Sequence, residues 1–177
     1  MHKIQTNAIL SKSLINMLDQ VPEDILSVIE FIKNKTSIDI NSDRDFVESY
    51  EKDWSNISGF ADVVSRPIDA QQSATLLYLF SKKNIPITIS AGKTNLTGSA
   101  TPKEGLVINT ELMLSPKVEI DFNQKTAKVS VGEILENVRD EILCQSNNKL
   151  YYPVDPTSRK DARVGGTISC NASGFIP

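Results

Sequence analysis

Hydrophobic residues at helical spacing occupy the N-terminal part of the chain. Residues 8–36 predict two helices, and the second carries Pro22 in its first turn, where a proline is tolerated. The stretch 42–45, Ser-Asp-Arg-Asp, resembles a helix cap and predicts another short helix that ends at about Lys52. We therefore expect residues 1–55 to form an N-terminal helical segment.

Further along, β-branched runs alternate with one amphipathic helix. Short strands are predicted at 61–65 and 87–89. The helix expected between them, at 70–83, is capped by Asp69. Its inward face is predicted from its apolar positions: Ala70, Ala74, Leu76, Leu77 and Phe80. This order predicts a βαβ unit with a parallel strand pair and a right-handed crossover, and it places the next loop at the carboxyl end of a strand.

The third part of the chain combines strands with one more helix. A strand is predicted at 106–108, and a hairpin with one buried face at 117–131, turning at 123–125. The apolar positions of the hairpin alternate with polar ones: Val118, Ile120, Phe122, Ala127, Val129 and Val131. A helix is expected at 133–144, where Cys144 is predicted to be a buried small apolar residue.

Composition and charge exclude several classes of function. With 40% hydrophobic and 23% charged residues, the chain has the composition of a soluble globular protein. Its net charge is −3 and no Lys/Arg-rich run is present, so we expect no nucleic-acid partner. No apolar run is long enough for a transmembrane segment, and the first residues lack a signal-peptide core, so we expect a cytoplasmic location. His2 is the single histidine and the two cysteines have no CxxC spacing, which argues against zinc or Ser–His chemistry.

The loop that follows the strand at 87–89 is made almost wholly of small residues. It belongs to the stretch PITISAGKTNLTGSATP, residues 86–102. Glycines permit positive φ, so successive N–H groups can turn towards one anion, and the loop suits a phosphate or diphosphate. An ordinary surface loop is the alternative. A Walker A loop is excluded, because Ile87 stands where that motif needs its first glycine.

A second segment near the end of the chain has similar chemistry. YPVDPTS, residues 152–158, predicts a rigid turn with two prolines around an acid. VGGTISCNASG, residues 164–174, then repeats paired glycines and small polar side chains. We expect the two segments to converge on one ligand.

These two segments resemble those of a known family. The first is similar to the GGGT-small-L-S/T-GG-A-x-P segment of FAD-linked oxidases of the vanillyl-alcohol oxidase/p-cresol methylhydroxylase (PCMH) superfamily. The second resembles its PPDPSS…TIGGxIATNASG segment, most closely in the D-lactate dehydrogenase/glycolate oxidase subunit branch. The match runs from about Phe60 to Pro177. It implies an α+β (α/β-like) fold: a PCMH-type FAD-binding domain at 56–177, with an N-terminal βαβ subdomain and the start of a second subdomain.

The resemblance also implies a set of cofactor-binding residues. The first loop would hold the FAD diphosphate through backbone N–H groups and comprises Ala91, Gly92, Lys93, Thr94, Asn95, Leu96, Thr97 and Gly98. The second segment would line the cofactor with Pro153, Asp155, Pro156, Ser158, Gly165, Gly166, Cys170 and Asn171. No catalytic residue and no metal ligand is assigned.

Three residues depart from the family pattern. Lys93 and Ser99 replace glycines, and Arg163 stands where the family usually has a small residue. A positive φ at Lys93 would cost about 1 kcal/mol or more. Its ammonium group would either offset this cost near the phosphates or point into solvent.

The resemblance implies an FAD-dependent oxidoreductase. We expect hydride transfer to the flavin from a small 2-hydroxy acid such as D-lactate or glycolate. The FAD is expected to be non-covalent, because the first loop contains neither histidine nor cysteine. An oligomer or an electron-acceptor partner is possible for this class.

Two other functions stay open. A UDP-N-acetylmuramate dehydrogenase-like flavoenzyme shares the fold, although the PVDPTS turn argues against it. A truncated or non-catalytic flavin-fold binding module is the other. Since the family's flavin domain continues beyond this point and a substrate domain follows, we expect the chain alone to have weak or absent FAD affinity and no turnover.

Overall fold

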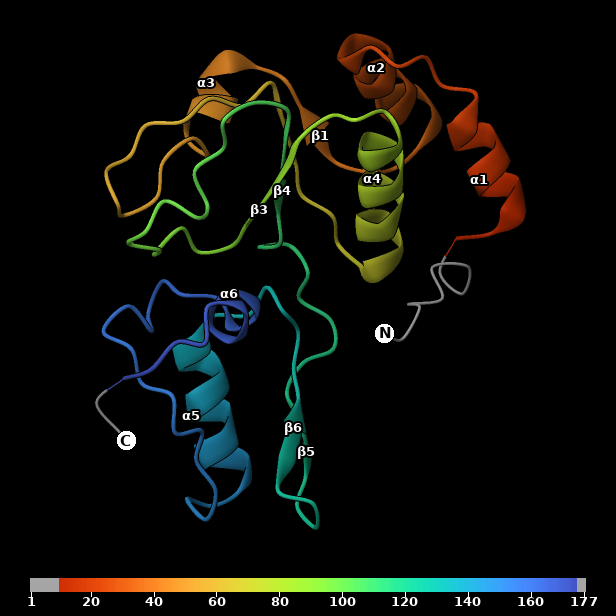
Figure 1. Cartoon of the computed structure of the whole chain (residues 1–177). Helices are drawn as coiled ribbons and strands as arrows, with labels where there is room; N and C mark the ends of the chain where they lie inside the picture. Colours follow the sequence, from red (N-terminus) through yellow and green to blue (C-terminus); the bar gives the residue numbers. More distant parts are fainter. Residues whose placement is uncertain (1–9, 175–177) are drawn as a thin grey trace, which may run out of the picture.

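A four-stranded sheet forms the centre of the first half of the chain (Figure 1). The structure, a computed structural model, describes residues 10–174. The strands are β1 (Ile40–Asn41), β2 (Val63–Ser65), β3 (Ile87–Ser90) and β4 (Leu106–Asn109). They lie in the order β1-β2-β4-β3, with β2 and β3 parallel to β4 and β1 antiparallel to β2.

The βαβ unit is present, but its two strands do not pair with each other. β4 lies between them, and Leu106 is the register partner of both Val63 and Ile87. The expected direct pair of β2 and β3 is therefore wrong. The physical reason is burial: all four residues of β4 are buried, as a central strand requires, whereas Ile89 in β3 is 53% exposed at the edge.

Helices cover both faces of this sheet (Figure 1). α1 (Lys12–Asp19), α2 (Ile25–Lys35) and α4 (Ala70–Lys82) pack on one face, where Val63, Leu106 and Ile108 point. α3 (Arg44–Glu48) lies on the other face, against Val64 and Val107. Neighbouring residues of one strand thus enter different cores, as the two-residue period of a strand dictates.

The boundaries of two N-terminal helices differ from those expected. α2 begins at Ile25, because the Asp24 carboxylate accepts a hydrogen bond from the Ser27 N–H (2.8 Å) and caps the helix. Pro22 therefore precedes the helix rather than lying in its first turn. α3 ends at Glu48, short of the predicted Lys52, which instead forms a β-bridge with Ser58.

α4 carries the predicted cap, and its buried face matches the predicted one only at Leu76 and Phe80. The Asp69 side chain accepts a hydrogen bond from the Gln72 N–H (2.8 Å). The buried residues of α4 are Thr75, Leu76, Leu79 and Phe80. The buried residues recur at spacings of three and four residues, as Leu76, Leu79 and Phe80 do, and so lie on one side of the helix. Leu77 is rotated by about a quarter-turn from Leu76 and is therefore 42% exposed.

The second half of the chain is built around α5 (Leu135–Gln145). β5 (Glu119–Asp121) and β6 (Thr126–Lys128) form the predicted antiparallel hairpin, with Ile120 opposite Ala127. The residues that form this core are Val118, Ile120, Val129, Leu135, Val138, Ile142, Leu150, Tyr152 and Val164. The buried face of the hairpin is only partial, since Phe122 is 55% exposed beyond the reach of α5.

One further expectation in this half is corrected, and one helix was not expected. Cys144 is exposed, because it follows buried Ile142 by two residues and so lies on the opposite side of α5. Residues 164–169 form a helix, α6 (Val164–Ser169), although paired glycines disfavour helix. No described helix has the length and apolar character needed to span a membrane. His2 and the start of the helix expected at residue 8 lie outside the described residues.

Candidate functional site

The two small-residue segments face each other across a cleft of about 930 Å³ between the halves of the molecule. The structure therefore brings together residues that are far apart in sequence, as expected. The predicted site residues that line the cleft are Ala91, Gly92, Lys93, Thr94, Asn95, Thr97, Ser158, Gly165, Gly166 and Cys170. Residues that we did not assign also line it, including Thr110, Val131, Ala162, Arg163, Ser169 and Ala172.

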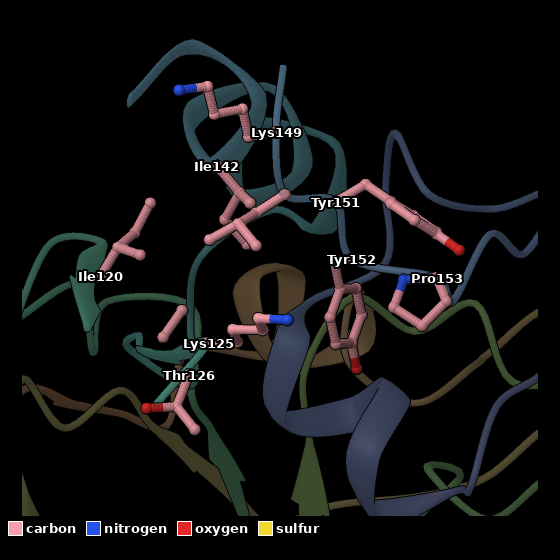
Figure 2. A pocket seen from close by; sticks show the side chains of 10 residues that line it. Ile120, Lys125, Thr126, Ile142, Lys149, Tyr151, Tyr152 and Pro153 are labelled. Atoms are coloured by element: carbon pink, nitrogen blue, oxygen red, sulfur yellow. The ribbon is translucent and has the colours of Figure 1, made fainter. Parts of the chain in front are cut away.

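Six predicted site residues do not line this cleft: Leu96, Gly98, Pro153, Asp155, Pro156 and Asn171. Leu96 is 72% exposed, and Gly98 has a φ of +76° that lets the first loop turn back. Pro153 instead borders a second hollow of about 360 Å³ between the β5–β6 hairpin and α5. Figure 2 shows Ile120, Ile142 and Tyr152 around that hollow.

Asp155 has a structural partner set. Its carboxylate pairs with Arg139 of α5 and with Arg159 (3.2 Å). Arg159 also pairs with Glu136, one turn before Arg139 on the same helix. These ion pairs fasten the proline-rich turn to α5 and so fix the chain that leads into the cleft.

The first loop presents backbone donors that the protein does not use. Within the described chain, the N–H groups of Gly92, Lys93, Thr94, Asn95 and Leu96 donate to no acceptor. The Asn95 Oδ1 instead accepts the Thr97 N–H (2.7 Å), which closes the loop from inside. Successive free N–H groups in a turn form a concave site for an anion.

Lys93 takes neither of the two orientations considered from the sequence. Its φ is +56°, and its Nζ donates to the Ser49 carbonyl (2.7 Å) and lies 4.3 Å from the centroid of the Tyr50 ring. Burial lowers the pKa of Lys93, and the nearby Glu111 carboxylate opposes this. The ammonium group therefore braces the loop from behind, and the cation–π contact offsets the cost of the positive φ.

Residues between α3 and β2 complete this brace. The Tyr50 hydroxyl donates to Glu111 Oε1 (2.9 Å), and burial together with this bond raises the pKa of Tyr50 to about 12. The Trp54 N–H donates to the Lys93 carbonyl (3.1 Å). The Asp53 carboxylate accepts the Ala100 N–H (3.4 Å) at the far end of the loop. Only the tertiary structure reveals these partners, because Tyr50, Asp53 and Trp54 lie about forty or more positions before the loop residues that they contact. The domain boundary expected at residue 55 stays a prediction.

Asn109 fixes the start of the loop. It is fully buried at the end of β4, and its Nδ2 donates to Ser90 Oγ and to the Ala91 carbonyl, both at 3.0 Å. Its Oδ1 accepts the Glu111 N–H (2.9 Å). The sequence holds a signal for this role, since an asparagine directly after three apolar strand residues needs buried partners.

Glycines at the cleft serve two different purposes. A Cβ at Gly92 would collide with the Asp161 carbonyl oxygen, so this glycine lets the first loop pack directly on the chain before α6. A Cβ at Gly166 would meet only the Ala91 Cβ, at 3.5 Å, an ordinary contact. The space beside Gly166 is therefore open towards the cleft, as a site approached by a ligand requires.

The cleft is positively charged although the chain is acidic. Its lining includes no aspartate or glutamate, and its charged side chains are Lys93 and Arg163. The whole chain has a net charge of −3. Free N–H donors, small side chains and the absence of acids fit an extended anionic cofactor such as a dinucleotide. No group of metal-binding side chains occurs among the described residues.

Comparison with known families agrees with this geometry. A sequence model of the FAD binding domain matches residues 61–176, and the chain belongs to this family. It is 32% identical over 114 residues to the glycolate oxidase subunit GlcD of Bacillus subtilis, covering 64% of this chain and 24% of that protein. It is also 32% identical over 113 residues to a D-lactate dehydrogenase of Archaeoglobus fulgidus, with coverages of 63% and 24%. The chain thus spans about a quarter of the length of these relatives.

Solved structures share the fold. An alkyldihydroxyacetonephosphate synthase superposes with a TM-score of 0.73 at 19% identity, over 88% of this chain and 31% of that one. A glucooligosaccharide oxidase from Acremonium strictum, which carries a 6-S-cysteinyl, 8α-N1-histidyl FAD, superposes with a TM-score of 0.60 at 15% identity, over 74% and 27%. The expected α+β fold of a PCMH-type FAD-binding domain is confirmed.

Proposed function

We propose that this chain is the FAD-binding part of an oxidoreductase that oxidises a small 2-hydroxy acid of the D-lactate or glycolate type. Membership of the FAD binding domain family supports the cofactor. The names of two relatives at 32% identity, a glycolate oxidase subunit and a D-lactate dehydrogenase, support the substrate class. Bound FAD would supply the redox chemistry by accepting a hydride from the α-carbon of the substrate.

The observation that carries the proposal is the row of free N–H groups from Gly92 to Asn95, residues that line a cleft without acids. A hydrogen bond to a charged group contributes roughly 1.5–3 kcal/mol. A few such bonds from a preformed loop reach the roughly 8 kcal/mol of micromolar binding. In this proposal the first loop holds the diphosphate, while Gly165, Gly166 and Ser158 close the other wall around the cofactor.

We propose that the FAD is bound without a covalent link. The first loop contains neither cysteine nor histidine. Cys170 is the cysteine on the cleft, and its Sγ accepts a weak hydrogen bond from Asn95 Nδ2 (3.6 Å). Acid denaturation of the flavin-loaded protein should release all flavin into the supernatant. Flavin that stays with the polypeptide, and is lost from it in Cys170→Ser, would contradict this.

The function is tested by titrating the intact protein with FAD and then adding D-lactate or glycolate without oxygen. We expect FAD to bind and one of the acids to bleach the flavin absorbance. Binding without bleaching by a panel of 2-hydroxy acids would favour a non-catalytic flavin-binding module. No binding at millimolar FAD would overturn the proposal.

A further inference from the structure

Arg163 differs from every other arginine of the chain. Arg44, Arg66, Arg139 and Arg159 each form an ion pair with a carboxylate. Arg163 forms none in the described part of the chain: its Nη1 donates to the Gly132 carbonyl (2.9 Å), and its Nε is buried without a hydrogen-bond partner. A partly buried guanidinium with unused donors requires a partner.

The surroundings of Arg163 supply no protein anion. Arg163 lines the same cleft as the first loop, and no acidic residue lines that cleft. The other cation there, Lys93, is occupied by Ser49 and Tyr50. Arg163 is therefore the charge that the cleft offers to a ligand.

The position of Arg163 points to the group it would meet. It follows Ala162, whose Cα would lie 3.2 Å from a Cβ at Gly92, so the chain directly before Arg163 packs on the first loop. Gly132, which holds the guanidinium, is itself packed tightly on the Thr110 carbonyl. The side chain is thus anchored at Nη1 and its Nε is buried, so the end of the guanidinium group, with the donors of Nη2 and the second N–H of Nη1, is the part left for a ligand.

We propose that Arg163 binds the diphosphate of FAD by a charge-assisted hydrogen bond, together with the loop donors. This inference rests on the proposed function and adds a specific contact to it. Guanidinium groups match phosphate oxygens through two parallel N–H donors. The Arg163 charge would thus contribute part of the binding free energy for the diphosphate, which backbone N–H donors would otherwise supply alone.

The test compares Arg163→Gln with Lys160→Gln. Lys160 is an exposed lysine of the same segment that does not line the cleft, so its substitution removes the same charge without touching the site. We expect Arg163→Gln to weaken FAD binding about tenfold or more, as loss of a charged hydrogen bond does. Lys160→Gln should bind FAD as the wild type does. Riboflavin, which lacks phosphate, should bind equally to all three proteins.

Each outcome separates the inference from the proposed function. If the wild type binds FAD and Arg163→Gln binds it equally well, the inference fails while the proposed function stands. A matching loss of riboflavin affinity would assign Arg163 to the flavin ring or to packing and overturn the diphosphate contact. If the wild type does not bind FAD, both the proposed function and the inference fail.

A measurement on the wild type covers the case in which the variant does not fold. Phenylglyoxal modifies accessible guanidinium groups, and the ion-paired arginines serve as internal controls. We expect FAD and inorganic pyrophosphate to protect Arg163, and riboflavin not to, as read by mass spectrometry of the peptides. Equal labelling of Arg163 with and without saturating FAD would overturn the contact.

Discussion

The two segments that form the cleft have similar residues but use their backbones in opposite ways. In the first loop, the N–H groups of residues 92–96 have no acceptor in the described chain. In the second segment, the Val164 N–H donates to the Glu133 carbonyl (3.0 Å) and the Gly165 N–H to the Val131 carbonyl (2.9 Å). Those two bonds tie the start of α6 to the chain before α5.

The difference teaches that small residues answer two separate needs. In the first loop they leave backbone donors uncovered, and side chains from elsewhere, such as Asn109 and Lys93, hold the loop in shape. In the second segment they allow close packing, since a Cβ at Gly165 would lie 2.9 Å from the Val131 Cβ. The backbone of the first segment thus supplies donors and that of the second fixes the shape, although Gly92 also packs on Asp161 and Gly166 is open towards the cleft.

The largest effect is expected from Gly92→Val, which should break both roles at once. Its side chain would collide with the Asp161 carbonyl, so the first loop and the chain before α6 must move apart. We expect a loss of about 3 kcal/mol in the free energy of unfolding and loss of measurable FAD binding. Urea unfolding and FAD titration check this. A variant of wild-type stability would show that the packing contact is not needed.

Gly166→Val should separate the two roles. The position has room for a Cβ beside Ala91, so stability should change by less than about 1 kcal/mol, aided by the better helix propensity of the new residue. FAD affinity should fall roughly tenfold to a hundredfold, because the valine side chain would occupy space in the cleft. Each factor of ten corresponds to a loss of about 1.4 kcal/mol of binding free energy. Gly166→Ala is the smaller matched step. Unaltered FAD affinity in Gly166→Val would exclude this wall from the cofactor site.

Alkaline pH should weaken the brace behind the first loop. The folded pKa of Tyr50, about 12, lies above its ordinary value of 10.0, so the folded state holds the hydroxyl proton more tightly. This contribution is fully present below pH 10 and is lost as pH rises through 12, up to about 2–3 kcal/mol. Urea unfolding of wild type and Tyr50→Phe at several pH values checks this. The difference between the two proteins should shrink between pH 10 and 12; a constant difference would contradict the raised pKa of Tyr50.

The smallest effect is expected for Lys93→Met, which removes the brace but keeps the backbone donors. Loss of the bond to Ser49 and of the Tyr50 contact should cost about 1 kcal/mol and weaken FAD binding only a few-fold. The exposed Lys103 offers a control as Lys103→Met. Calorimetry and FAD titration at low and high salt distinguish the roles. A loss of affinity larger than tenfold that fades with salt would mean that Lys93 contacts the phosphates directly.

Local sequence determined most of the elements, because their causes lie within a few residues. Asp69 caps α4 from one residue away, and alternation in 117–131 sets the register of the hairpin. The glycine-rich segments likewise indicated the FAD family, because a backbone that meets a ligand needs small residues at fixed positions. The match of the FAD binding domain to 61–176 confirms that identification.

Only the tertiary structure decided the contacts between distant segments. β4 lies between β2 and β3 and, like β2, is buried throughout, which depends on helices packed on both faces. α6 forms because the carbonyls of Glu133 and Val131 accept its first N–H groups, a gain that its own glycines do not predict. The free charge of Arg163 is likewise a property of its neighbours. Periodicity and caps act over a few residues, whereas burial, charge pairing and strand order depend on which distant residues meet.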